Sequence, residues 1–146
     1  MQMLAGALGT TVLGYASYTD LRWRVIRNWA VGGAAASGLV LGAALHGLPG
    51  LLTGVEGIAA GAVWWVAVTY AGLGAGDAKL AMAIGAILGP TAAFAGPAVG
   101  HMLCALGLIP WIVWRRVRRL PWRHMAVPMA PWIAVGTALV ALFRFA

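Results

Sequence analysis

The chain has 146 residues, of which 62% are hydrophobic and only 9% are charged. Soluble globular domains carry about 25% charged residues, so the composition excludes a soluble enzyme and a soluble DNA-binding module. Disorder is excluded as well, because it requires low hydrophobicity. The sequence therefore predicts an all-α membrane protein that crosses the bilayer several times and forms a single domain over residues 1–146.

Six apolar runs follow one another along the chain, and a spanning helix needs about 20 mostly apolar residues. The runs cover residues 3–19, 29–45, 51–71, 78–88, 91–114 and 126–143. An uncharged turn at 46–50 separates the second run from the third, and Gly89-Pro90 is the strongest breaker between the fourth and the fifth. The fourth run rises only about 16 Å, against about 30 Å of hydrocarbon. Asp77, at its beginning, is therefore expected to be recessed in the membrane or in a water-filled notch, unless the break lies near Gly96.

The charges predict the orientation of these helices. Ten Lys and Arg residues against three acids give a net charge of +7, and the cations lie between apolar runs, as in cytoplasmic loops. With six helices, one side of the membrane receives nine of the ten cationic side chains, all but Arg144. That side is predicted to be cytoplasmic, so both termini face outside. The first residues carry no basic region of a signal peptide, so the first run is expected to remain a spanning helix.

Glycine makes up 21 of the 146 residues, and several glycines are spaced four apart. Small residues at this spacing let helix backbones approach closely, which predicts a compact bundle. The pairs are Gly38/Gly42, Gly50/Gly54, Gly57/Gly61, Gly85/Gly89 and Gly96/Gly100. A proline inside a helix removes a backbone hydrogen bond and bends the helix, so Pro131 is expected to bend the sixth helix.

The chain has three acidic residues, Asp20, Glu56 and Asp77. Ionisable residues in or beside membrane spans are costly and are functional by default. Asp20 and Asp77 both fall at cytoplasmic helix ends, separated by a helical hairpin that returns the chain to the same side. Packed helices bring such ends within about 10 Å, so the two carboxyl groups are expected to face one another. Glu56 lies in the outer part of the third run and is not expected to join them.

Two adjacent carboxyl groups in a partly dry site share a proton, because both cannot ionise comfortably. The ionised group activates a water molecule and the protonated group polarises a peptide carbonyl, which hydrolyses the peptide without a metal or a cofactor. Alternatively, each aspartate only caps a helix or pairs with a nearby arginine. Composition alone leaves both interpretations open.

Three segments of the chain resemble motifs of one family. Residues 74–80, G-A-G-D-A-K-L, resemble the G-x-G-D-x-K-L motif of type IV prepilin peptidases, which are intramembrane aspartic proteases. Residues 20–29, D-L-R-W-R-V-I-R-N-W, are similar to their other aspartate segment, D-x-R-x-x-x-I-P-N. Residues 127–136, V-P-M-A-P-W-I-A-V-G, are similar to their last helix, I-P-F-G-P-F-x-x-x-G. Together, in the family's order, they form a stronger signal than a lone G-x-G-D.

The resemblance implies that Asp20 and Asp77 are the catalytic pair and that no metal or cofactor takes part. The motif residues that would support the pair are Gly74, Gly76, Lys79, Arg22 and Asn28. The substrate would be a membrane-anchored prepilin or pseudopilin, cut after a glycine that follows a short basic leader. The enzyme would lie among the lipids of the bacterial cytoplasmic (inner) membrane with its active site on the cytoplasmic side, and nucleic acid is not expected as a partner.

The chain departs from the family pattern at three places. Arg27 stands where the family has proline, Ala71 stands where many members have glutamate, and the single Cys104 cannot form the two C-x-x-C pairs of the longer members. The resemblance therefore implies a short form, a peptidase without methyltransferase activity, most similar to enzymes of tight-adherence (Flp) pili. The alternatives are a small transporter or channel subunit, which also places acids at helix breaks, and a non-catalytic pilin-handling bundle.

The cationic residues near the two aspartates have less specific interpretations. Lys79 lies two residues from Asp77, and such positions do not face each other on a helix. It is expected either to reach the cytoplasmic headgroups or to help hold the substrate. The arginines between 115 and 123 are interpreted as an orientation signal in contact with lipid.

Overall fold

The computed structural model describes residues 2–72, 74–119 and 127–145. Within these ranges the chain is all-α, as the composition predicts, and it contains no strand. The helices are α1 (Gln2–Trp23), α2 (Asn28–Ala62), α3 (Trp64–Ala71), α4 (Ala75–Leu88), α5 (Pro90–Val117) and α6 (Ala130–Phe145). Two described segments are long and apolar enough to cross a membrane, Asn28–Val66 and Pro90–Val117.

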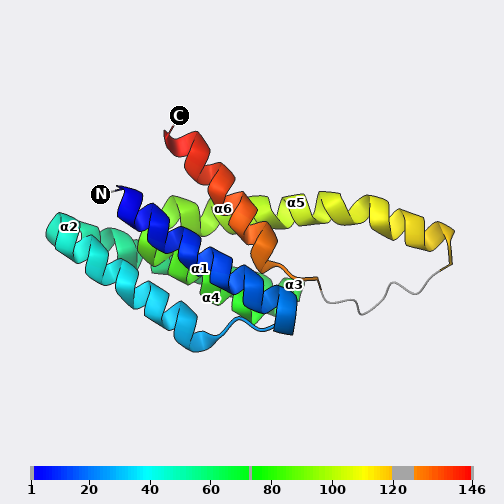
Figure 1. Cartoon of the computed structure of the whole chain (residues 1–146), viewed down its shortest axis with the longest axis horizontal. Coiled ribbons are helices and arrows are strands. Elements are labelled where there is room, and N and C mark those ends of the chain that lie inside the picture. Colours follow the sequence, from blue (N-terminus) through cyan, green and yellow to red (C-terminus); the bar gives the residue numbers. More distant parts are fainter. Residues whose placement is uncertain (1, 73, 120–126, 146) are drawn as a thin grey trace.

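The long helix α2 reverses its direction at Gly47, whose backbone leaves the helical region with φ 62° and ψ −146°. The backbones of Gly42 and Gly50 touch on either side of this reversal, so that a Cβ atom on Gly50 would overlap the Gly42 carbonyl group. A left-handed φ and such a close approach both favour glycine. The helix is therefore a hairpin of two arms, residues 28–46 and 48–62 (Figure 1), which agrees with the turn predicted at 46–50.

The most extensive helix–helix contact joins α2 to α4 and is made by small residues. Gly57 faces Gly85 so closely that a Cβ atom on either would overlap the other's carbonyl group, and Gly61 lies against the backbone of Ala81. In a bilayer, where lipid is as apolar as leucine, close backbone packing of this kind replaces the hydrophobic drive to associate. The predicted role of the glycine pairs is thus met at this interface.

Glycine and proline set the boundaries of α4 and α5. Gly72 ends α3 with φ 69°, and Gly89 ends α4 with φ 85°. Pro90 then begins α5, where its missing N–H has no helical partner to lose. The break predicted at Gly89-Pro90 is confirmed, and the alternative near Gly96 is wrong because Gly96 lies inside α5.

Two helix boundaries differ from the sequence prediction. Helix α1 continues to Trp23, so Asp20 lies on the helix and not in the loop after it. Helix α6 begins at Ala130, so Pro131 is its second residue and lies in the first turn, where proline is tolerated. The prediction that Pro131 bends the sixth helix is therefore wrong, because a proline in the first turn interrupts no hydrogen bond within the helix.

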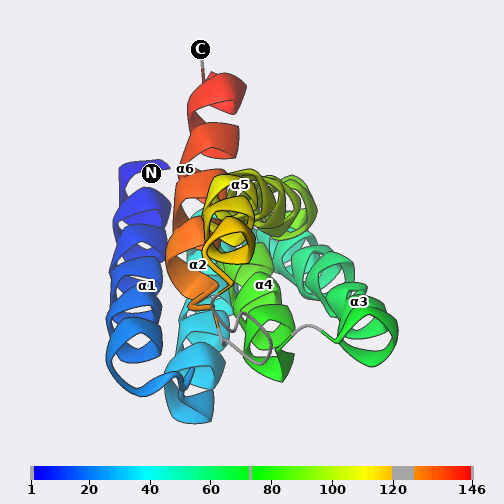
Figure 2. The same cartoon turned by 90° about the vertical axis from the view of Figure 1, so that its right-hand side faces the viewer.

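The bundle gathers three helix ends at one place. Helix α1 ends, and α4 and α6 begin, at the same end of the bundle, which faces the viewer in Figure 2. The beginning of α1 and the end of α6 lie towards the opposite end, and α5 projects past the site end (Figure 1). A buried apolar cluster joins these helices behind their ends and consists of Leu13, Ala16, Leu80, Ile84, Ala92, Ala130 and Ile133.

Candidate functional site

Asp20 and Asp77 both lie at the end of the bundle where α1 stops and α4 starts. Both side chains are buried, with only 9% and 8% of their surfaces exposed. Their carboxyl groups are close enough to repel one another electrostatically. Two buried acids that interact in this way cannot both carry a full charge at low cost. The structure thus brings together the two residues that lie 57 positions apart in the sequence.

The carboxyl group of Asp20 is held by the first turn of α6. Its Oδ2 atom accepts a hydrogen bond from the backbone N–H of Ala130 at 2.9 Å, and Ala130 is fully buried. The carboxyl oxygen therefore serves as the acceptor for a backbone N–H at the amino end of this helix, the place where a capping side chain lies. Asp20 therefore does cap a helix, but it is one that begins 110 residues later in the chain.

Asp77 lies in the first turn of α4, next to two glycines that leave room for its side chain and for Ile26. Its backbone N–H donates to the Gly74 carbonyl at 2.9 Å, and a Cβ atom on Gly74 would come within 3.2 Å of the Asp77 Oδ2 atom. A Cβ atom on Gly76 would come within 3.2 Å of Ile26, which belongs to the connection between α1 and α2. The glycines of the G-A-G-D segment therefore allow this connection to pack closely on the start of α4.

A second contact joins α4 to the start of α2. The Lys79 Nζ atom donates a hydrogen bond to Asn28 Oδ1 at 2.8 Å. Lys79 thus links α4 to the first residue of α2, a contact that neither sequence interpretation anticipated. Arg22, in contrast, is exposed near the end of α1. Among the described residues, no group of three or more His, Cys, Asp or Glu side chains is placed to hold a metal ion.

The structure adds one residue that sequence reasoning did not select, His101 on α5. Its imidazole interacts electrostatically with Asp77. The ring is stacked on Trp64 of α3, with the ring centres 5.2 Å apart and the planes 10° apart. One signal in the sequence could have indicated His101. It lies four residues after Pro97 in an apolar helix, so the two residues share one face of that helix.

A family comparison places these residues in context. A model of the type IV leader peptidase family matches residues 7–116, which include both aspartates and His101. The chain belongs to the type IV leader peptidase family. No curated protein and no solved structure matches the chain. Membership makes this protein a peptidase, and the resemblance seen in the sequence motifs is confirmed at the level of the family.

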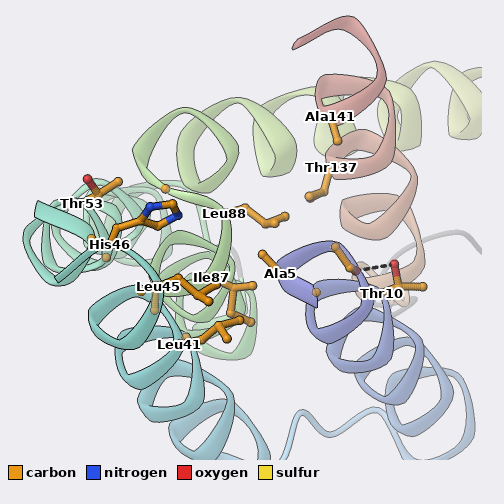
Figure 3. A pocket seen from close by; sticks show the side chains of 18 of the residues that line it. Ala5, Thr10, Leu41, Leu45, His46, Thr53, Ile87, Leu88, Thr137 and Ala141 are labelled. Carbon is orange, nitrogen blue, oxygen red and sulfur yellow. Dashed lines mark hydrogen bonds between the residues drawn. The ribbon is translucent and has the colours of Figure 1, made fainter. Parts of the chain in front are cut away.

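The leader peptidase also contains a cavity of about 740 Å³, at the end of α4 away from the aspartates (Figure 3). Thr10 of α1, Leu41 and His46 of α2, and Leu88 of α4 contribute to its lining. Neither aspartate lines it. The buried carboxyl pair, and not this cavity, therefore marks the candidate active site of the peptidase.

The link between Lys79 and Asn28 leads to a prediction. In a double-mutant cycle with Lys79→Met and Asn28→Ala, we expect a coupling energy of about 0.5–1.5 kcal/mol in the free energy of unfolding, measured by chemical denaturation in detergent. The side chains are partly open to solvent, which keeps the value small. Arg22→Met on Asn28→Ala is the matched control and should be additive. Additive losses for Lys79 and Asn28 would show that the contact contributes nothing.

Proposed function

We propose that this leader peptidase is an aspartic endopeptidase that removes the leader of type IV or Flp-type prepilins, with Asp20 and Asp77 as its catalytic residues. The observation that carries the proposal is the pair of buried, mutually repelling carboxyl groups at the meeting point of α1, α4 and α6. The family match supports a leader peptidase. The Gly74, Gly76, Lys79 and Asn28 contacts support a positioning role for the surrounding motif residues.

The environments of the two acids support different roles in the hydrolysis. Asp20, which accepts the Ala130 N–H, is the ionised base, and Asp77 is the protonated acid. Asp20 takes a proton from water as the water oxygen attacks the peptide carbon, while Asp77 gives its proton to the carbonyl oxygen. The intermediate then collapses. The C–N bond breaks as Asp20 passes its proton to the leaving nitrogen, and Asp77 recovers the proton of the former carbonyl oxygen.

The helix arrangement supports six spans, if the two arms of α2 are counted separately and the second arm is joined with α3. The beginning of α1 and the end of α6 then face the same side, outside, and the aspartates face the cytoplasm of a bacterial inner membrane (Figure 1).

Helix α5 has 28 residues and a length of about 42 Å, so its end passes the roughly 30 Å of hydrocarbon. There Arg115 stacks over Trp111 at 4.9 Å and Arg118 over Trp114 at 5.8 Å, an arrangement suited to anionic headgroups.

A cleavage assay tests the proposal. The protein is co-expressed with each of a panel of tagged prepilins, Flp-type ones included, in a bacterial host that lacks its own prepilin peptidase. We expect the wild type to shorten at least one prepilin to a product whose new amino end follows a glycine. The Asp20→Asn/Asp77→Asn double variant, at matched membrane levels, should leave every prepilin intact. Uncut prepilins across the panel, or equal cleavage by the double variant, would contradict the proposal.

A further inference from the structure

His101 is held in a rigid setting on α5. Pro97, inside α5, has no N–H to give to the Ala93 carbonyl one turn earlier, so this carbonyl loses its helical partner. The indole N–H of Trp64 fills the gap with a hydrogen bond to Ala93 of 3.2 Å. The same indole is the surface on which His101 is stacked. The proline, the tryptophan and the histidine therefore form one unit between α3 and α5, beside α4.

A hydrogen bond at Nδ1 determines which nitrogen of the His101 ring carries the proton. The His101 Nδ1 atom lies 2.7 Å from the Pro97 carbonyl oxygen. A carbonyl oxygen only accepts, so Nδ1 carries the proton and, in the neutral ring, Nε2 is an acceptor. This Nε2 atom is buried and has no hydrogen-bond partner within the described part of the chain. An acceptor left unpaired in such a place is costly, so the site is suited to receive a donor.

We propose that His101 is a positioning residue of the peptidase site, whose Nε2 atom accepts a hydrogen bond from the protonated Asp77 carboxyl group or from a water molecule bound to it. The inference rests on the proposed function. His101 on α5 and Asp20 on α1 both interact electrostatically with Asp77. The acceptor keeps the acidic proton of Asp77 on one oxygen and fixes the direction in which it is offered. His101 does not itself touch the reacting atoms.

Two substitutions separate this role from simple packing. His101→Phe keeps a flat ring for Trp64 but removes both nitrogens, whereas His101→Gln removes the ring and keeps a polar group near the position of Nε2. We expect His101→Phe to lower kcat about 10–100-fold with KM within about threefold, and to change the pH profile of kcat. His101→Gln should retain more activity. His46→Phe, on the exposed turn of α2, is the matched control. A fully active His101→Phe enzyme, or one more active than His101→Gln, would overturn the proposal.

A measurement without substrate separates the failure of this inference from the failure of the proposed function. The protein is labelled with ¹⁵N-histidine and studied by NMR in detergent micelles, and the His101 signals are assigned by their loss in His101→Phe. We expect the Nε2 signal to move in Asp77→Asn and to stay in place in Glu56→Gln, which changes an exposed acid. An unmoved signal in Asp77→Asn overturns the inference. A moved signal in a protein that cleaves no prepilin keeps the contact and rejects only the proposed reaction.

Discussion

Asparagine in place of Asp77, or in place of Asp20, is expected to lower kcat/KM for prepilin cleavage by about 10³-fold or more. The loss is expected because hydrolysis needs one carboxyl group to take a proton and the other to give one. Asparagine has nearly the same shape but does neither at neutral pH. The measurement is cleavage of a purified prepilin by each variant in detergent or in lipid nanodiscs. Glu56→Gln is the control and should cleave at the wild-type rate.

The same substitutions are expected to act differently on stability. Asp77→Asn replaces a buried acid, which is costly to ionise beside Asp20, with a neutral amide of the same shape, so its unfolding free energy should equal or exceed that of the wild type. Asp20→Asn keeps an oxygen that can accept the Ala130 N–H, whereas Asp20→Ala leaves it unpaired and should cost about 1 kcal/mol. A variant that keeps wild-type cleavage at either position would refute the two-aspartate mechanism. A variant that lost its fold together with its activity would contradict the stability expected here.

Alanine in place of Gly85 is expected to lower the free energy of unfolding by about 2–3 kcal/mol or more. Its Cβ atom would overlap the Gly57 carbonyl group, which belongs to backbone and cannot turn away as a side chain can. The two helices must then separate along their largest contact, and overpacking of this kind is costly. Since α4 carries Asp77, cleavage should fall as well. The measurements are chemical unfolding in detergent and prepilin cleavage.

Gly33→Ala provides the matched control for this prediction. Gly33 also lies inside a helix, but a Cβ atom added there would meet nothing within 4 Å. We expect this variant to be as stable as the wild type or more stable by about 0.4–1 kcal/mol, because alanine restricts the unfolded chain. Equal effects of Gly85→Ala and Gly33→Ala would show that the α2–α4 contact does not depend on a bare backbone.

Local signals in the sequence were sufficient for several boundaries. Proline fixes its own φ and glycine tolerates a positive φ, so Gly47 and Gly89-Pro90 marked the reversal of α2 and the start of α5 in advance. The end of α1 and the start of α6 were placed wrongly. The polar stretch that begins at Asp20 resembles a loop, but its first residues continue α1 to Trp23, and the Asp20 carboxyl group accepts its hydrogen bond from Ala130. A contact between residues so distant in the chain leaves no local pattern.

The sequence by itself determined that this protein is an all-α membrane-type chain of the leader peptidase family, and it singled out Asp20 and Asp77. Composition, apolar run length and motif spacing are local properties, and they suffice for these conclusions. Only the tertiary structure decided what surrounds the two acids: the α6 amino end at Asp20, the Lys79–Asn28 link, and His101 beside Asp77. These features depend on helix ends that meet in space, because a burial or a hydrogen bond across the bundle is a property of the packed chain.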